Sequence, residues 1–305
     1  MGSDVPAHDG KRSAVIIGNL HSRRTTELYA RAHELLAARG VTIAAAHNVR
    51  DGREVRRRVE RYVKDGCELI IIGGGDGTMT GAVGAFARTK SVLGVLPFGT
   101  GNSFALSLGI PSDVERAVDV IAGGCVARVD LGVVNGTYFA NFATIGLSST
   151  IARRTPNLLK KILGPASYAA AGVLPILSNR AFEAKIRWEG DEIRLRTHQL
   201  IVANGRYFGF TPVLPDATIV DGLLSVFTTS GLSRWDVARM FLAMYQGKHT
   251  TLADADYFSA KEVVIKTHPK QFVDVDGEAY GKTPVHFSIA RRALRVLVPQ
   301  GFTGT

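Results

Sequence analysis

Cysteine is scarce in this sequence, because only Cys67 and Cys125 occur in 305 residues. Two thiols cannot build the disulfide framework that stabilises small secreted domains. We therefore expect a cytoplasmic protein in a reducing compartment, stabilised by an ordinary hydrophobic core. Apolar residues make up 46% of the chain, and this length is sufficient for two domains of ordinary size.

Long apolar runs are also missing. The longest run, Tyr168 to Leu177, is interrupted by Pro175 and is half the length that a membrane-spanning helix needs, about 20 residues. Residues 1–12 contain no apolar segment of the kind found in a signal peptide. We expect a flexible N-terminal tail there and no membrane-spanning segment.

Acidic residues are in deficit: 27 Asp and Glu stand against 37 Lys and Arg, a formal net charge of +10. Such a surface favours anionic partners, such as nucleotides, nucleic acids or acidic lipids. The densest basic segment, residues 53–64, repeats valine every fourth position, which is typical of an amphipathic helix with a solvated basic face. Because no base-reading motif or aromatic platform accompanies it, we expect no nucleic-acid partner.

The first part of the chain alternates strand and helix patterns. Strands are predicted at residues 14–18, 41–46, 69–72 and 92–96, with amphipathic helices between them. A further helix is expected near residue 112, where Ser112 and Glu115 have the spacing of a capping box. This alternation predicts an α/β nucleotide-binding domain over residues 13–129, with a parallel sheet and helices on both faces.

The second part of the chain has mostly β patterns. Asn135 and Gly136 form a hairpin signal between two β-rich runs. We predict a β-rich sandwich domain over residues 130–290. The last segment, residues 291–305, contains an apolar run that could pair with either domain.

Glycines directly follow two of the predicted parallel strands. One cluster is Gly73 to Thr78, and the other includes Thr100, Gly101 and Asn102. Backbone N–H groups in such turns can hold a phosphate, and the carboxyl ends of parallel strands face one crevice. The alternative for either loop alone is tight packing. Asp76 is unusual beside a phosphate, so we expect it to hold a loop amide, contact a metal or lie near the reaction centre.

Two Asp-Gly turns occur in the β-rich part, at Asp221 and at Asp276, the latter followed by Glu278. Each turn by itself is also explained by hairpin chemistry, because Asp and Gly favour tight turns.

Six motifs occur in a fixed order and together identify a resemblance. They are GGGDGT at residue 73, PFGTGN at 97, GLSSTIARR at 146, VANGRYFGF at 202, LPDATIVDGLLSV at 214 and DVDGE at 274. In this order the sequence resembles the diacylglycerol kinase catalytic family of lipid kinases, which includes sphingosine and ceramide kinases. The resemblance spans residues 14 to 299.

The resemblance implies that ATP binds in a cleft between the α/β and β-rich domains. Its phosphates would lie on the glycine loops, with Asn48 as a weaker contact. The implied nucleotide-binding residues are Asn48, Gly73, Gly74, Gly75, Asp76, Gly77, Thr78, Thr100, Gly101 and Asn102. Asp276 is implied as the general base, with Glu278 beside the site. A magnesium ion is implied at Asp221, with backbone oxygens of Thr218 and Leu223, an oxygen shell that suits a hard cation.

The implied substrate is a lipid alcohol, either diacylglycerol or a sphingoid- or ceramide-like lipid. We therefore expect peripheral contact with an anionic membrane. Arg153, Arg154, Lys160 and Lys161 beside an apolar segment are candidates for that contact, although an ordinary amphipathic helix would look the same. Whether two copies form a homodimer is left open.

The chain departs from the family pattern near the expected cleft. Met79, Thr80 and Gly81 replace an Asn-Glu continuation, Ser103 replaces an aspartate, and the early Asn-Pro-x-Ser-Gly motif is reduced to Gly18–Ser22. These changes keep two alternatives open. One is a non-catalytic lipid- or nucleotide-binding regulator; the other is an NAD kinase, which shares the Gly-Gly-Asp-Gly motif.

Overall fold

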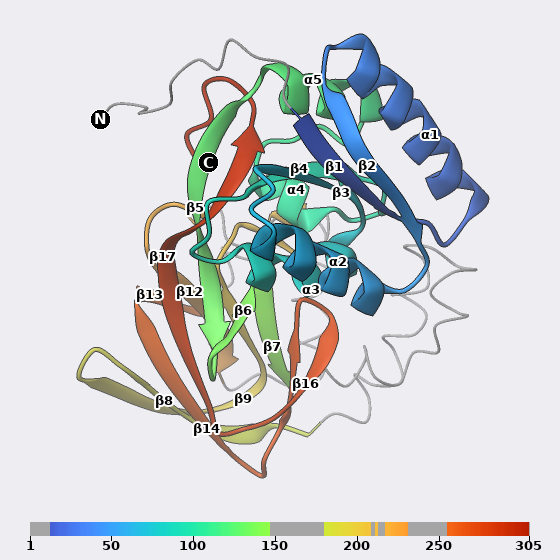
Figure 1. The fold of residues 1–305 in the computed structure, drawn as a ribbon. Helices are drawn as coiled ribbons and strands as arrows, with labels where there is room; N and C mark the ends of the chain where they lie inside the picture. Colours follow the sequence, from blue (N-terminus) through green and yellow to red (C-terminus); the bar gives the residue numbers. More distant parts are fainter. Residues whose placement is uncertain (1–12, 147–179, 209–210, 213–216, 231–254, 305) are drawn as a thin grey trace.

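A computed structural model describes residues 13–146, 180–208, 211–212, 217–230 and 255–304 (Figure 1). Its N-terminal part contains a parallel sheet in the order β2-β1-β3-β4. β3 is buried at all six positions, as its run of isoleucines predicts for a central parallel strand. The strands are β1 (Ser13–Asn19), β2 (Thr42–Val49), β3 (Leu69–Gly74) and β4 (Val92–Pro97).

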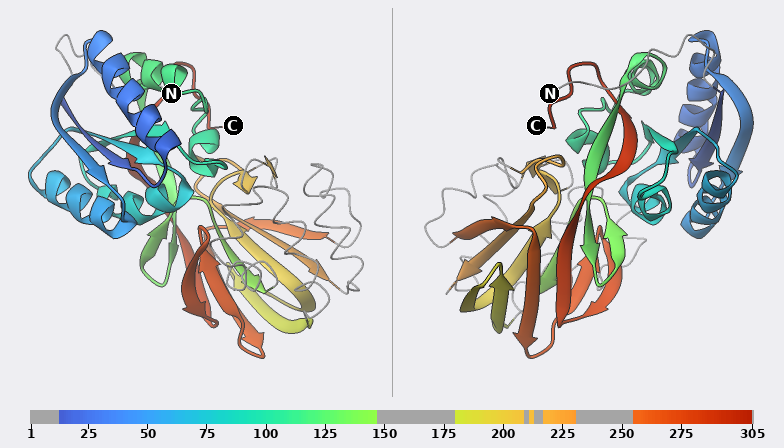
Figure 2. Two further views of the ribbon diagram at one scale, coloured as in Figure 1. Left: turned by 90° about the vertical axis from the view of Figure 1, so that its right-hand side faces the viewer. Right: turned by 60° about the vertical axis from the view of Figure 1, so that its left-hand side comes forward.

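Helices cover both faces of this sheet. α1 packs against α5, and α2 packs against α3 (Figure 2). The prediction of an α/β domain with a mainly parallel sheet is therefore confirmed. The helices are α1 (Arg23–Ala38), α2 (Gly52–Lys64), α3 (Asp76–Phe86), α4 (Ser103–Ser107) and α5 (Val114–Gly123).

The expected cap of α5 is wrong by one residue. Asp113, not Ser112, is the N-cap residue, and its side chain accepts a hydrogen bond of 2.9 Å from the backbone N–H of Arg116. Aspartate and serine are about equally good at this position, so the local sequence did not separate them.

The C-terminal part is a β-rich domain with a hydrophobic core of its own, as predicted. The Asn-Gly hairpin is confirmed, because Asn135 and Gly136 have positive φ values of 44° and 88° and join β5 to β6. The strands of this domain are β5 (Cys125–Val134), β6 (Thr137–Phe139), β7 (Phe142–Gly146), β8 (Phe182–Trp188), β9 (Asp191–Ala203), β10 (Tyr207–Phe208), β11 (Thr211–Pro212), β12 (Leu224–Ser230), β13 (Ala255–Ala260), β14 (Glu262–His268), β15 (Phe272–Val275), β16 (Glu278–Lys282) and β17 (Val285–Val298).

β17 connects the two parts into one continuous sheet (Figure 1). Its first half pairs with β14, and it pairs along most of its length with β5. Near its end, Arg295 and Val296 pair in parallel with Val92 and Leu93 of β4. The pairing of β17 with β5 is interrupted between Ala290 and Leu294, which marks a bulge.

The strand order creates a switch point beside β1, because the chain leaves β1 toward β2 and then returns to β3 on the other side. Ligands of open α/β sheets bind at the carboxyl ends of strands flanking such a point. The described residues include no helix that is both long and apolar enough to cross a bilayer.

Candidate active site

The two glycine loops touch each other at the carboxyl ends of β3 and β4. A Cβ on Gly99 would lie 2.6 Å from the Cα of Gly75, and a Cβ on Gly73 would lie 2.2 Å from the Phe98 ring. No side chain fits at either position. Glycine therefore allows a close backbone approach here, and the first loop leads directly into the N-terminus of α3.

Asp76 joins the first loop to the second. Its carboxylate accepts bonds from the Phe104 backbone N–H at 3.2 Å and from the Ser103 hydroxyl at 3.4 Å. Burial raises the pKa of Asp76, while hydrogen bonds from the backbone and side chain of Ser103, and from the Phe104 and Asn102 N–H groups, lower it. Holding loop amides, the first of the three roles expected for Asp76, is therefore what the structure shows.

Asn102 shapes the second loop through bonds to its own backbone. Its side-chain oxygen accepts from the Gly99 N–H at 3.0 Å, and its amide donates to the Gly99 carbonyl at 2.9 Å. The residue is buried and has a left-handed φ of 50°. Thr100 is exposed at the tip of the same loop, and Gly101 is partly exposed. Binding of nucleotide by these residues stays a prediction.

Asp276 lies in the β15–β16 turn and contacts both the β6–β7 connection and α3. Its Oδ1 accepts backbone N–H bonds from Asn141 and Phe142, both at 2.9 Å. Its Oδ2 accepts from the Ala140 N–H at 2.8 Å and from the Thr80 hydroxyl of α3 at 2.9 Å. The side chain is only 6% exposed, and burial raises the pKa of Asp276 while these bonds lower it. The carboxylate therefore fastens the turn to the β6–β7 connection and to α3.

The same turn brings Glu278 to the glycine loop. Asp276 and Gly277 have positive φ values of 48° and 85°, the geometry of a tight two-residue hairpin. Glu278 is exposed, and its Oε1 lies 3.6 Å from where a Cβ on Gly77 would stand. Three predicted motifs thus meet: both glycine loops and the Asp-Gly-Glu turn.

Asn19 is a site residue that sequence reasoning missed. It is buried at the end of β1, and its amide donates to the Thr78 hydroxyl at 2.8 Å across the switch point. Its only signal was its place in the reduced Gly18–Ser22 motif. Asn48 lies in the same row of the sheet, because it pairs with Gly18, which pairs with Gly73. Two strand spacings put Asn48 about 10 Å from Gly73, so its nucleotide contact stays a prediction.

The residues that depart from the family pattern are inside this network. Thr80 donates to Asp276, and Ser103 donates to Asp76, so each replacement supplies a hydroxyl to a carboxylate that joins distant segments. Both replacements therefore make polar contacts across the site.

Asp221 lies in a separate turn that directly precedes β12. Its exposed carboxylate accepts from the Thr218 N–H at 3.2 Å and the Leu223 N–H at 2.8 Å. Each carboxylate oxygen has capacity left for a cation. Among the described residues, no group of three or more His, Cys, Asp or Glu side chains is arranged for a metal. A role for the Thr218 and Leu223 carbonyls as ligands stays a prediction.

Asp130, which sequence reasoning also missed, is buried behind that turn. It accepts from the Gly222 N–H at 2.7 Å and the Arg292 N–H at 2.6 Å. Burial raises the pKa of Asp130, the two backbone bonds lower it, and the charge of Asp221 raises it further. The charge of Arg291, whose side chain lies against Gly222, lowers this pKa and partly compensates the two carboxylates.

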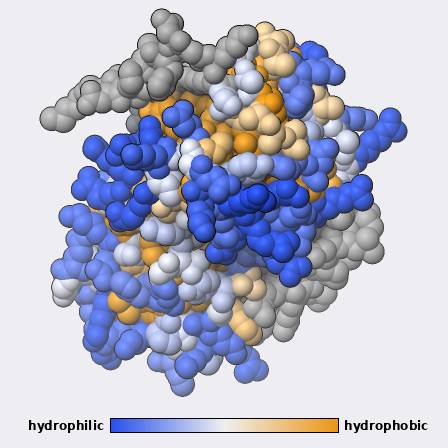
Figure 3. All heavy atoms as spheres, in the orientation of Figure 1, coloured by the Kyte–Doolittle hydropathy of each residue, from blue (hydrophilic) through white to orange (hydrophobic). Residues whose placement is uncertain are grey.

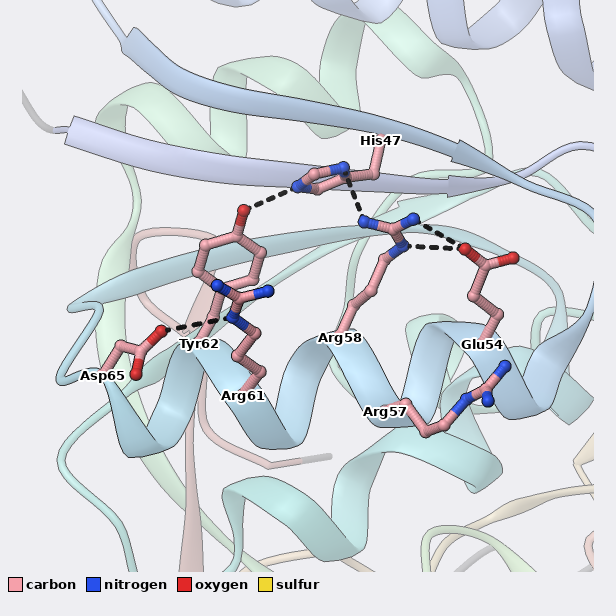
Figure 4. A pocket seen from close by; sticks show the side chains of 7 residues that line it. All are labelled: His47, Glu54, Arg57, Arg58, Arg61, Tyr62 and Asp65. Atoms are coloured by element: carbon pink, nitrogen blue, oxygen red, sulfur yellow. Dashed lines mark hydrogen bonds and ion pairs between the residues drawn. The ribbon is translucent and has the colours of Figure 1, made fainter.

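The Arg-rich helix α2 forms a hydrophilic ridge on the surface (Figure 3). Beside it lies a pocket of about 400 Å³, here called the α2 pocket (Figure 4). His47 lies between Tyr62, at 2.6 Å, and Arg58, at 2.9 Å. Burial, followed by the charge of Arg58, lowers the pKa of His47. Arg58 also pairs with Glu54 at 2.6 Å, and Arg61 lies 3.7 Å from Asp65, so two of the three arginines of this pocket have a carboxylate partner.

The candidate membrane residues Arg153, Arg154, Lys160 and Lys161 lie outside the described residues.

Comparison with known proteins finds two family models that together match most of the chain. One, described as the diacylglycerol kinase catalytic domain, matches residues 13–134. The other, described as the YegS C-terminal NAD kinase beta sandwich-like domain, matches residues 142–298.

Individual relatives agree with these matches. A diacylglycerol kinase of Staphylococcus aureus is 30% identical over 243 residues, which cover 79% of this chain and 77% of that protein. A diacylglycerol kinase of Staphylococcus epidermidis is 29% identical over 244 residues, with the same coverage. The crystal structure of a diacylglycerol kinase from Bacillus anthracis has the same fold, with a TM-score of 0.73, 20% identity and coverage of 96% of this chain and 98% of that one.

Proposed function

Because the chain belongs to the diacylglycerol kinase catalytic family and is a kinase, we propose that it transfers the γ-phosphoryl group of ATP to the hydroxyl of a lipid alcohol. The observation that carries this proposal is the bond between Thr80 and Asp276. It joins the helix of the glycine loop to the Asp-Gly-Glu turn of the other domain. Phosphoryl transfer needs this juxtaposition of a phosphate cradle and a carboxylate.

The ATP phosphates are proposed to lie at the N-terminus of α3. The first N–H groups of a helix have no partner within it, and the helix dipole favours an anion there. Gly77 is exposed at this position. Asp76 is compatible with a nearby phosphate because its carboxylate is engaged by the N-terminus of α4.

Asp276 is proposed as the acceptor of the substrate proton. Three of its four donors are backbone N–H groups, whereas the Thr80 hydroxyl is on a rotatable side chain. A substrate hydroxyl could replace the Thr80 hydroxyl at Oδ2 while the other three bonds persist. Burial raises the pKa of Asp276, which makes its carboxylate a stronger proton acceptor.

Magnesium is proposed in two roles, one structural and one with the bound nucleotide. An ion at Asp221 would have a structural role, because the Asp221–Gly222 turn is held to the buried Asp130 through the Gly222 N–H. Magnesium bound with ATP would neutralise charge on the transferring group.

The acceptor is proposed to be diacylglycerol, which the names of the relatives indicate, with a sphingoid- or ceramide-like lipid as the alternative. A kinase for such a substrate must reach a bilayer, so peripheral contact with an anionic membrane is part of the proposal.

The test is transfer of labelled phosphate from ATP to a panel of lipid alcohols, with and without magnesium. NAD is included as an acceptor, because phosphorylated NAD as the main product would establish the NAD kinase alternative. Binding of ATP or lipid without turnover of any acceptor would establish the regulator alternative.

Three variants test the assignment of the base. Asp276→Asn should lower the rate at least about 100-fold, which is the lower range of general-base catalysis. Thr80→Val, which removes only the exchangeable donor, should keep turnover within about tenfold. If Glu278→Gln instead causes the larger loss while Asp276→Asn is active, Glu278 is the base.

A further inference from the structure

A second basic pocket lies at the end of α3. It is lined by the segment between α3 and β4 and by residues of β5 and β17. Its volume is about 260 Å³, and we call it the α3–β17 pocket. Besides Thr89 and Ala293, its lining consists of the five basic residues Arg88, Lys90, Arg128, Arg292 and Arg295. No acidic residue contributes to it.

The contrast with the α2 pocket concerns charge compensation. There, Glu54 and Asp65 pair with Arg58 and Arg61. Within the part of the chain that the structure describes, none of the five cations of the α3–β17 pocket forms an ion pair with a carboxylate. Like charges repel each other, so the fold must hold these side chains together.

Two arginines of the pocket are held in place by backbone in an unusual conformation. Arg88 and Arg292 have left-handed φ values of 62° and 48°, which residues other than glycine rarely adopt. The Arg88 N–H donates to the Ala293 carbonyl at 2.7 Å, and the Arg292 N–H donates to Asp130 at 2.6 Å. These bonds fasten the end of α3 and the bulge of β17 to each other and to a buried carboxylate.

One of the arginines is anchored and others are available to a ligand. Arg295 is partly buried and donates from Nη1 to the Lys90 carbonyl at 2.9 Å. Arg88, Arg128 and Arg292 are exposed, and no hydrogen bond or ion pair of their guanidinium groups is found among the described residues.

The α3–β17 pocket is distinct from the glycine loops. The first loop precedes α3, whereas Arg88 follows it, and eleven residues of helix span about 16 Å. Lys90 likewise precedes β4, whereas the second loop follows that strand. The pocket is therefore at the opposite end of the parallel strands from the glycine loops, near the start of β4.

We propose that the α3–β17 pocket binds a phosphomonoester or free phosphate. Such an anion carries nearly two negative charges and three acceptor oxygens. The planar guanidinium group of arginine matches phosphate with two parallel hydrogen bonds, and four of the five cations are arginines. Its source is either a soluble phosphate compound or the head group of a phosphorylated lipid. This proposal does not depend on the proposed kinase substrate, because binding is measured without turnover.

The test is titration calorimetry of the full chain with inorganic phosphate at constant ionic strength. The variant Arg128→Gln/Arg292→Gln removes two exposed charges without removing a side-chain bond. The matched control, Arg57→Gln/Arg61→Gln, removes the same charge from the α2 pocket. We expect at least a tenfold weaker phosphate affinity for the first variant and an unchanged affinity for the control. If the first variant fails to fold, Arg88→Gln/Lys90→Gln replaces it.

Vesicle sedimentation then identifies the source of the phosphate. Phosphatidylcholine vesicles contain either phosphatidic acid, a phosphomonoester, or phosphatidylglycerol, a phosphodiester. Loss of binding to phosphatidic acid vesicles alone in the pocket variant supports a lipid head group; unchanged vesicle binding beside weakened phosphate binding supports a soluble ligand. Phosphate affinity that is equal in the pocket variant and the wild type, equally weakened in the control, or absent from the wild type overturns the proposal.

Discussion

Asp276–Gly277 and Asp221–Gly222 are the same dipeptide in the same domain, and the two glycines have similar positive φ values of 85° and 76°. Their carboxylates differ in burial and in the position of their hydrogen-bond donors in the chain. Asp276 is buried and bonds to residues of α3 and of the β6–β7 connection, all more than 100 positions away in the chain. Asp221 is exposed and bonds to backbone two and three positions away. The Asp276 carboxylate thus fastens its turn to two distant parts of the chain, whereas the Asp221 carboxylate bonds only within its own turn.

The largest effect should come from Asp276→Ala. It leaves four donors near the domain junction without their acceptor, and unsatisfied buried groups cost about 1–3 kcal/mol each. We expect a loss of at least about 3 kcal/mol in the free energy of unfolding, measured by urea denaturation, together with loss of kinase activity. Asp221→Ala is the matched control and should lose less than half as much stability. Equal losses in the two variants would contradict the contrast between the turns.

Asp76→Ala sharpens the comparison, because Asp76 is a second carboxylate, partly buried, that joins distant segments. Removing the acceptor of the Phe104 N–H should cost about 1–3 kcal/mol of stability and loosen the second loop. We expect ATP affinity to fall about tenfold, equivalent to about 1.4 kcal/mol, measured by calorimetry.

Asp113→Ala is the control for that experiment. It removes an aspartate cap of similar kind from α5 and should cost about 1 kcal/mol of stability without weakening ATP binding. An equal loss of ATP affinity in both variants would show that Asp76 has no special connection with the second loop.

Asp221→Asn should change stability by less than about 1 kcal/mol, because asparagine also forms hydrogen-bonded turns. Its diagnostic effect concerns magnesium. A bound ion raises the melting temperature of the folded state by mass action. We expect magnesium to raise the melting temperature of the wild type and to have no such effect on the variant. A shift of the same size in both would remove Asp221 from the metal site.

The smallest effect is expected for Glu192→Gln, at an exposed ion-pair cluster. Bonds from Lys185 and then Arg187 lower the pKa of Glu192 from 4.5 to about 2. A lowered carboxyl pKa stabilises the folded state above the unfolded value and loses that contribution as the pH falls through the folded value. The variant should be slightly less stable than the wild type at pH 7, and the difference should shrink between pH 4.5 and about 2. A difference that grows on acidification would contradict the prediction.

Carboxyl groups whose pKa is raised should respond to pH in the opposite direction. Burial raises the pKa of Asp76, Asp130 and Asp276, so each favours the folded state at low pH and loses that contribution as the pH rises through its folded value. Their contribution therefore partly offsets the acid destabilisation from groups such as Glu192.

Much of the fold was predictable because its signals are local. The apolar run of β3 and the glycines after it indicated a buried strand that ends in a loop, and the Asn135–Gly136 turn has the conformation that its dipeptide favours. The exchange of Ser112 for Asp113 as the cap of α5 is an error of the same local kind, because both residues can accept the same bond.

The contacts of the site were less predictable, because they join residues that are far apart in the chain. Thr80 was noted only as a departure, yet it bonds to a carboxylate 196 positions away. Asp130 carries no motif, and it holds both the Asp221–Gly222 turn and the bulge of β17.

The amino-acid sequence by itself determined where strands alternate with helices, where glycines end the parallel strands, and in which order the kinase motifs occur. These features depend on neighbouring side chains and on backbone freedom, which act over a few residues. Only the tertiary structure decided which carboxylates became buried acceptors and that five basic residues from three separate segments gathered in one pocket. Burial and charge proximity depend on the packing of distant segments, and no local pattern contains that information.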